Sequence, residues 1–188
     1  MPIQKSPVDG LSRPIGPPLK WGVTLYSGLS QLYFRSLLRA VIRVGELHRP
    51  GLRILDFGCG GGELKKLLPG ALVTGYDIRP DLTEVPDWRA VPFDVLVANE
   101  VFYSFQEGDL RSLLEELKGR SPRPRLVVGI SRRGFLNKMG MVLLGRPQAH
   151  AAARLAPMRE LAVLQEYGRI LGHRGVLGLA DAYSLEFR

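Results

Sequence analysis

The sequence predicts an α/β fold, with a doubly wound, mostly parallel β-sheet that carries helices on both faces and finishes in a C-terminal antiparallel hairpin. Two observations lead to this prediction. From residue 52 onward, short apolar runs alternate with segments of helical periodicity, which is the order that a parallel sheet requires. Two further strand-like runs then follow one another closely within residues 168–188, around a glycine-containing turn at 175–178.

The N-terminal part of the chain contains no strand-like run. Residues 1–20 are rich in proline and glycine and lack periodicity, so we expect an extended or disordered arm there. Apolar residues recur at helical spacing over residues 27–46, which predicts an amphipathic helix within an N-terminal helical cap over 21–48. Residues 21–188 are then expected to form one domain around one hydrophobic core.

The composition is that of an ordinary globular protein, with 45% hydrophobic and 23% charged residues. One cysteine, Cys59, excludes an internal disulfide and fits a reducing compartment, so we expect a cytoplasmic protein. The net charge of +8 comes from the C-terminal part, because residues 1–118 carry 14 basic and 14 acidic side chains and residues 119–188 carry 12 and 4. A surface field of one sign attracts anionic partners.

A glycine-rich segment follows the first predicted strand and precedes a predicted helix. Gly58, Gly60 and Gly62 permit a sharp turn and leave the backbone open to a ligand. The pattern departs from the nicotinamide dinucleotide fingerprint, because Glu63 takes the place of its last glycine. This acid and Asp56, two residues before the first glycine, suit a positively charged ligand better than a diphosphate. A dehydrogenase is therefore a distant alternative.

A second acid ends the next predicted strand. Asp77 lies 21 residues after Asp56, where a carboxylate can accept hydrogen bonds from both ribose hydroxyls of an adenosine. Ile78 follows directly and is placed to cover one face of the adenine. Two carboxylates at the ends of neighbouring strands, on either side of a glycine turn, therefore predict a site for a cationic adenosyl compound.

Three segments resemble, in the right order, the class I S-adenosylmethionine-dependent methyltransferase superfamily. Residues 54–62 resemble its motif I, residues 73–77 its ribose-binding strand end, and residues 93–102 its motif IV in the form common among small-molecule methyltransferases. The resemblance implies a Rossmann-like sheet, S-adenosyl-L-methionine as the cofactor and methyl transfer as the reaction. The cofactor-binding residues that it implies are Asp56, Gly58, Cys59, Gly60, Gly62, Asp77, Ile78 and Asn99.

The chain departs from this family at two places. The family has a third strand whose acid contacts the adenine, but here only residues 78–92 separate the strands that flank it, so we expect that strand to be truncated or lost. Asp87 or Trp88 then becomes the candidate for the adenine edge. After motif IV, Ser104 stands where many relatives have a histidine. The candidate catalytic residues, as a base for an oxygen acceptor, are therefore Tyr103, Glu100 and His150.

We expect in-line methyl transfer to a small-molecule or lipid-like acceptor, and no metal, because the sequence contains no cluster of metal ligands. Residues 132–167 are expected to form a helical insertion on the acceptor side. Within it, residues 132–146 combine cations with apolar side chains, a pattern that can hold an anionic acceptor or make a peripheral contact with an anionic membrane. The same pattern also fits a lid helix that packs on the sheet.

Two other functions remain open. The basic C-terminal part favours RNA or DNA as the acceptor. However, residues 118–159 contain one aromatic residue, Phe135, and motif IV lacks the Asn-Pro-Pro-aromatic tetrad with which amino-methylating enzymes hold a flipped base. Nucleic acid is therefore the less favoured partner. The second alternative is a non-catalytic module that has kept the fold, which would bind no S-adenosylmethionine.

Overall fold

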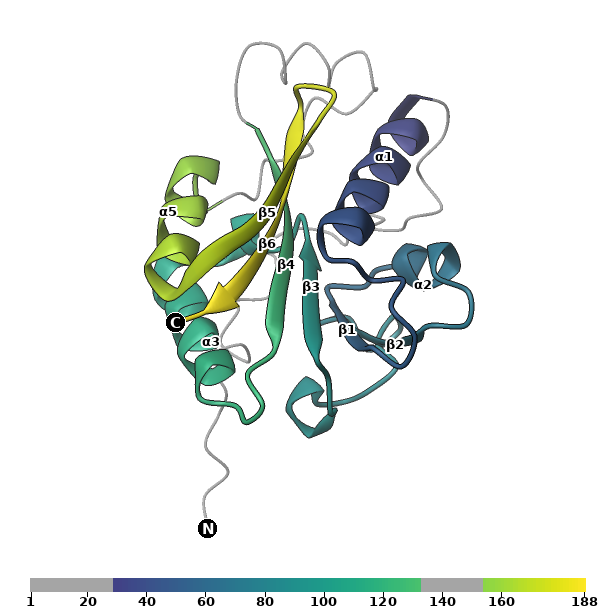
Figure 1. Ribbon diagram of the computed structural model, residues 1–188, viewed down its shortest axis with the longest axis horizontal. Helices are drawn as coiled ribbons and strands as arrows, with labels where there is room; N and C mark the ends of the chain where they lie inside the picture. Colours follow the sequence, from purple (N-terminus) through teal and green to yellow (C-terminus); the bar gives the residue numbers. More distant parts are fainter. Residues whose placement is uncertain (1–28, 133–153) are drawn as a thin grey trace.

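The computed structural model describes residues 29–132 and 154–188, which form a six-stranded sheet with helices on both faces (Figure 1). The predicted arm, 1–20, and residues 133–153 of the predicted acceptor-side insertion lie outside the described residues. In chain order the elements are α1 (Leu29–Val44), β1 (Arg53–Phe57), α2 (Glu63–Leu67), β2 (Leu72–Tyr76), the 3₁₀ helix η2 (Trp88–Ala90), β3 (Val95–Asn99), the 3₁₀ helix η3 (Phe102–Ser104), α3 (Glu107–Lys118), β4 (Arg125–Ser131), α5 (Pro157–Tyr167), β5 (Gly168–Val176) and β6 (Ala180–Phe187).

The strand order is β2-β1-β3-β4-β6-β5. Strand β6 runs antiparallel to both of its neighbours, β4 and β5, and the strands from β2 to β4 are parallel. The predicted Rossmann-like sheet with a C-terminal antiparallel hairpin is therefore confirmed. Between β2 and β3 the chain forms only turns and η2, so β2 is an edge of the sheet and the predicted loss of the third strand is confirmed.

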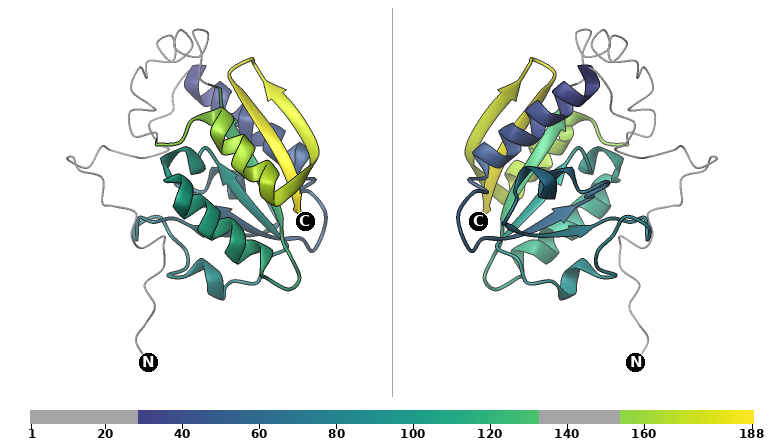
Figure 2. Two further views of the ribbon diagram at one scale, coloured as in Figure 1. Left: turned by 90° about the vertical axis from the view of Figure 1, so that its left-hand side faces the viewer. Right: turned by 90° about the vertical axis from the view of Figure 1, so that its right-hand side faces the viewer.

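Different helices cover the two faces of the sheet (Figure 2). Helices α1 and α2 cover one face, where Leu37 and Leu64 belong to a single apolar cluster. Helices α3 and α5, together with η2 and η3, cover the other face around Phe102. The central strands are apolar on both sides for this reason, so that Leu96 and Val97 of β3 enter opposite clusters and both are fully buried.

Figure 1 also shows the lower end of α1, the helix that precedes the sheet in the chain, beside the upper end of β3, and α1 packs against β3, β4, β5 and β6. The outer face of α1 carries exposed Arg35, Arg39 and Arg43, and this helix contains no acidic residue. No helix in the described part of the chain has the length and apolarity needed to cross a bilayer. The same residues contain no group of three or more histidine, cysteine or acidic side chains arranged to hold a metal ion.

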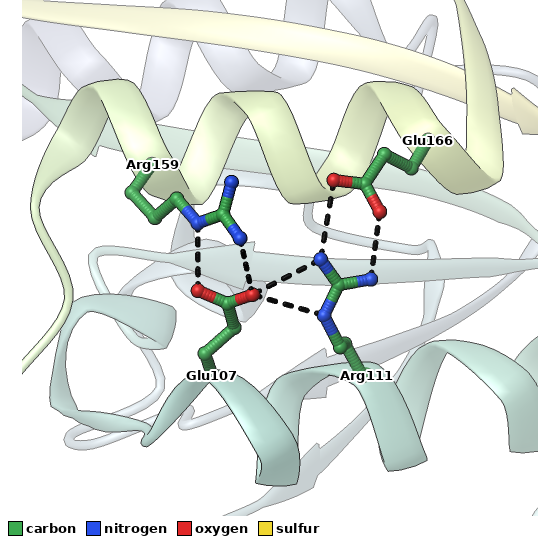
Figure 3. Close-up of polar contacts among 4 residues, drawn as sticks. All are labelled: Glu107, Arg111, Arg159 and Glu166. Atoms are coloured by element: carbon green, nitrogen blue, oxygen red, sulfur yellow. Dashed lines mark hydrogen bonds and ion pairs between the residues drawn. The ribbon is translucent and has the colours of Figure 1, made fainter.

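An ion-pair network on the protein surface fastens α5 to α3 (Figure 3). Glu107, in the first turn of α3, accepts hydrogen bonds from Nε and Nη2 of Arg159 on α5, each at 2.6 Å. Arg111, one turn further along α3, donates to Glu107 at 3.0 Å and to both carboxylate oxygens of Glu166 at 2.7 and 3.1 Å. The bonds from Arg159 and Arg111 lower the pKa of Glu107 to about 2.

We expect Glu107→Gln to lower the melting temperature at neutral pH. Because folding lowers the pKa of Glu107 from 4.5 to about 2, its stabilising contribution is present above pH 4.5 and is lost as the pH falls toward 2. Thermal melts of the variant and the wild type should therefore converge in acid. Asp109→Asn is the matched control, because it removes an acid from the same first helical turn that makes no ion pair in the described structure. Equal losses in the two variants would assign the effect to the helix dipole instead.

Candidate active site

The glycine turn after β1 has the conformation that its sequence predicts. Gly58, Gly60 and Gly62 have φ angles of 79°, 50° and 71°, in the left-handed region that favours glycine. The backbone N–H groups of Gly58 and Cys59 donate to the carbonyl oxygen of Tyr76, at 2.7 and 3.0 Å, and so tie the turn to the end of β2. The backbone of Gly58 remains exposed, as a ligand contact requires.

Gly58 also allows two turns of the chain to meet. A Cβ atom at this position would lie 2.5 Å from Cγ2 of Val101, in the turn that follows β3. Val101 comes directly after Asn99 and Glu100, two residues that the sequence assigns to the site. The glycine turn and the end of β3 are therefore in direct contact.

We expect Gly58→Ala to reduce both stability and S-adenosylmethionine affinity, because it adds a clash with Val101 to the cost of about 1–2 kcal/mol for a left-handed non-glycine residue. Gly62→Ala is the matched control. Its φ is also positive, but an added Cβ would meet no atom within 4 Å. Calorimetry and thermal melts should rank Gly58→Ala as the more damaging substitution, and Val101→Ala should partly rescue it. Equal damage in the two glycine variants would show that the contact with Val101 is irrelevant.

Asp56 is the most deeply buried acid of the turn region. It lies near the end of β1, beside Gly75 of β2 and Val97 of β3, and only 6% of its surface is exposed. Burial raises the pKa of its carboxyl group from 3.8 to about 7, and the negative charges of Asp77 and Glu84 add to this rise. A positive charge bound beside this carboxyl group would oppose the rise in its pKa and stabilise the carboxylate, so Asp56 favours a cation.

Asp77 points toward the glycine turn. Its Oδ2 atom accepts a hydrogen bond from the backbone N–H of Gly60 at 2.9 Å, and its Oδ1 atom accepts one from the N–H of Arg79 at 3.0 Å. Each carboxylate oxygen keeps further acceptor capacity for a hydroxyl group. Ile78, the next residue, is 58% exposed and free to cover a flat ligand.

A cavity of about 260 Å³ adjoins the turn. Of the residues assigned from the sequence, Asp56, Cys59, Gly60 and Gly62 line it, whereas Gly58, Asp77, Ile78 and Asn99 do not. Its other walls come from the glycine turn itself, α2, β2 and the loop after β2, through Gly61, Lys65, Val73, Gly75, Asp81, Leu82 and Glu84. The cavity is thus bordered by three carboxylates and one ammonium group.

Asn99 supplies a further acceptor at the end of β3. Its Oδ1 atom is buried and has no hydrogen-bond partner among the described residues. It lies against Gly129 of β4, at a place that any larger side chain would fill. A buried acceptor without a partner calls for a donor. Asp56, Asp77 and Asn99 therefore fit S-adenosylmethionine, which has a sulfonium, an ammonium group and ribose hydroxyls, and no phosphate.

Glu100 is held by residues from two other elements. Its Oε1 atom accepts a hydrogen bond from the hydroxyl of Tyr33 on α1, at 2.9 Å, and another from the hydroxyl of Ser131 at the end of β4. Its Oε2 atom accepts no hydrogen bond within the described residues. The backbone of Glu100 has a φ of 55°, which is uncommon for a side-chain-bearing residue and typical of functional sites. One carboxylate oxygen is thus fixed, and the other has no hydrogen-bond partner among the described residues.

Tyr103 lies in η3, close to two acids. Burial raises the pKa of its hydroxyl to about 12, and the charges of Glu100 and Glu160 add to the rise. This tyrosine therefore stays protonated and suits a hydrogen-bond donor rather than a base. Burial also raises the pKa of Cys59 to about 12, so it is a thiol with a structural role, and its Sγ lies 3.5 Å from the carbonyl of Leu82. His150 lies outside the described residues.

Sequence reasoning missed three residues, Tyr33, Ser131 and Glu84. Tyr33 gave no signal, because it occupied an apolar position of a helical pattern. Ser131 gave one, because it follows the apolar part of a predicted strand, and ligands bind beyond the C-terminal ends of parallel strands. The expectation for Trp88 was wrong, because its ring is fully buried, with its centroid 5.8 Å from that of Phe57. A ring in this position cannot reach an adenine.

Comparison with known proteins identifies the family and the fold of the chain. Residues 30–128 match the family model described as a methyltransferase domain. Among solved structures, the chain is similar to the PH0226 protein from Pyrococcus horikoshii OT3, with 13% identity, coverage of 89% of this chain and 95% of that one, and a TM-score of 0.63. It is also similar to magnesium protoporphyrin IX methyltransferase from Synechocystis PCC 6803 with bound SAH, with 16% identity, coverage of 85% and 87%, and a TM-score of 0.58.

A third similar structure is the N-methyltransferase NodS from Bradyrhizobium japonicum WM9, with 14% identity, coverage of 83% of this chain and 97% of that one, and a TM-score of 0.59. No curated protein matches the sequence. The likeness to the solved structures shows the fold, and the family model covers more than half of the chain. The chain therefore belongs to the class I methyltransferase family, enzymes that use S-adenosylmethionine as their cofactor.

Proposed function

We propose that this enzyme transfers the methyl group of S-adenosylmethionine to a small-molecule or lipid-like acceptor, at the C-terminal ends of β1 and β3. The observation that carries the proposal is the contact between Gly58 and Val101. It joins a turn flanked by the buried acid Asp56 to a turn that carries Glu100, whose Oε2 oxygen has no hydrogen-bond partner among the described residues. This contact supports the proposal because it brings the proposed site for a cationic donor next to the proposed proton acceptor.

On the donor side, Asp56 and the Oδ1 atom of Asn99 are proposed to receive the positive end of the donor, and Asp77 its ribose hydroxyls. When bound, S-adenosylmethionine supplies an already electrophilic methyl group. The protein must then mainly orient donor and acceptor and exclude water. The hydrogen bonds from the backbone N–H groups of Gly58 and Cys59 to the carbonyl oxygen of Tyr76 fix the turn against which the donor would bind.

On the acceptor side, Glu100 is proposed to take a proton from, or hydrogen-bond to, the attacking nucleophile. The hydroxyls of Tyr33 and Ser131 fix its Oε1 atom, so that Oε2 keeps one orientation. Tyr103, which stays protonated, is proposed to donate a hydrogen bond to the acceptor. A carboxylate at the position of Glu100 favours a hydroxyl or amine nucleophile, because each of these carries a proton that the carboxylate can accept. His150 remains a further candidate.

RNA or DNA is the second candidate acceptor, and one observation favours it. Arg35, Arg39 and Arg43 form an exposed basic row on α1, the helix that also supplies Tyr33 to the site. The described exposed large apolar residues near this row include Leu32 and no aromatic residue on which a base would stack. A peripheral contact with an anionic membrane through residues 132–146 stays a prediction.

The proposal is tested by incubating the enzyme with methyl-labelled S-adenosylmethionine and a cell extract separated into small-molecule, lipid and RNA fractions. We expect label in the small-molecule or lipid fraction and stoichiometric formation of S-adenosylhomocysteine. Asp56→Asn protein serves as the inactive control. Label that enters only the RNA fraction would replace this proposal with the second candidate. Absence of label from every fraction, from protein that binds the donor, would contradict both.

A further inference from the structure

We propose that Glu84, in the loop that replaces the third strand, is a positioning residue of the donor site. Its carboxylate braces the end of β2 and adds negative charge beside Asp56, so that the site prefers the sulfonium donor to the uncharged thioether of S-adenosylhomocysteine. The inference rests on the proposed donor site and extends it, because no residue of this loop was assigned from the sequence for this role.

Glu84 makes the hydrogen bonds that a neighbouring strand would make at the open edge of β2. Its backbone N–H donates to the carbonyl oxygen of Gly75 at 3.0 Å, and its Oε2 atom accepts the N–H of Gly75 at 3.1 Å. Both edge-facing backbone groups of Gly75 are therefore satisfied by one residue, as they would be by a paired strand. Its Oε1 atom accepts a bond from Nζ of Lys65 at 2.7 Å, which links the loop to α2.

Gly75 brings this carboxylate close to the glycine turn. A Cβ atom on Gly75 would lie 2.9 Å from Sγ of Cys59 and 3.6 Å from Cδ of Glu84. A side chain at this position would thus push the turn and the loop apart. Asp56 and Glu84 line the same cavity, on either side of Gly75, which is the register partner of Asp56.

The charges around Asp56 come from several elements. Asp77 directly follows β2, the loop contributes Glu84 and Asp81, and α2 contributes Lys65, while Cys59 of the turn stays a neutral thiol. Glu84 acts on Asp56 directly, because its charge helps to raise the Asp56 pKa, whereas Asp81 is not among the groups that do so. Lys65 offsets part of the Glu84 charge through their ion pair.

The test is calorimetric titration of the full chain with S-adenosylmethionine and S-adenosylhomocysteine across a pH series. Glu84→Gln keeps an oxygen that can accept the Gly75 N–H but removes the charge. We expect its affinity for S-adenosylmethionine to fall by about threefold to tenfold above pH 8, and its affinity for S-adenosylhomocysteine to fall less. The midpoint of the pH dependence should move to lower pH, because Asp56 then ionises more readily. Protonation of the ligand's own groups affects binding to every variant equally, so it does not contribute to the difference between variants.

Two further variants sharpen the result. Lys65→Met removes the counter-charge and should move the pH midpoint in the opposite direction, toward higher pH. Asp81→Asn, a charge-matched control that lines the same cavity, should leave the midpoint unchanged. If Glu84→Gln lowers the affinity for both ligands equally and the midpoint of the pH dependence does not move, the proposal is overturned. Glu84 would then only hold the end of β2 in place. If the wild type binds neither ligand, the donor site itself is wrong, which is a separate and distinguishable failure.

Discussion

Replacing Asp56 with asparagine is expected to abolish tight donor binding and at the same time to stabilise the ligand-free protein. Folding raises the pKa of Asp56 from 3.8 to about 7, so between these values the folded state holds a proton that the unfolded chain releases. Stability therefore falls as the pH rises from 4 toward 7, where a buried charge must form. Asparagine avoids the cost of forming a buried charge, but its neutral side chain cannot neutralise the positive charge of the donor.

The measurement combines thermal melts with calorimetry on Asp56→Asn. We expect a higher melting temperature than the wild type at pH 8, a difference that shrinks as the pH falls toward 4, and a loss of S-adenosylmethionine affinity of about a hundredfold. Asp77→Asn is the matched control. It should lose affinity without gaining stability, because its carboxylate accepts two backbone hydrogen bonds. Wild-type affinity in Asp56→Asn would remove Asp56 from the site.

Glu100→Gln is expected to slow methyl transfer by about a hundredfold or more while the donor affinity stays within about twofold. Glutamine can still accept the hydroxyls of Tyr33 and Ser131 through its amide oxygen, but its other terminal group is an amide nitrogen that accepts no proton. The rate is measured on the acceptor that the labelling experiment identifies, with donor affinity measured by calorimetry on the same preparation.

Ser131→Ala is the control for Glu100. It removes one of the two hydroxyls that fix Oε1 and leaves the carboxylate in place, so we expect a smaller loss of rate. An unchanged rate in Glu100→Gln would mean that the acceptor reaches the site already deprotonated, and the role proposed for Glu100 would be withdrawn.

The arrangement of the proposed donor half of the site was predictable because its determinants are local in sequence. Asp56 lies near the end of a buried strand, the three left-handed glycines occupy the turn between that strand and a helix, and Asp77 directly follows the next strand. The strands themselves were predictable because a parallel sheet buries both faces and leaves near-continuous apolar runs. The loss of the third strand followed from the short spacing between β2 and β3.

The acceptor half was only partly predictable, because it depends on contacts between distant segments. Glu100 was a candidate, but its hydroxyl partners, Tyr33 and Ser131, lie 67 and 31 residues away in the chain. No periodicity specifies that α1 crosses the ends of β3 and β4. Glu84 was missed for a similar reason, since a loop residue that substitutes for a strand has no local pattern. The wrong expectation for Trp88 came from its proximity in sequence, whereas packing against Phe57 determined its place.

The most direct test of the donor site is a calorimetric titration of the wild-type chain with S-adenosylmethionine at pH 8 and at pH 6. Two carboxylates beside an open glycine bend, one of them buried with a pKa of about 7, predict saturable binding to one site that is tighter at the higher pH. The absence of binding heat at about 1 mM ligand, or an affinity that increases in acid, would contradict the account.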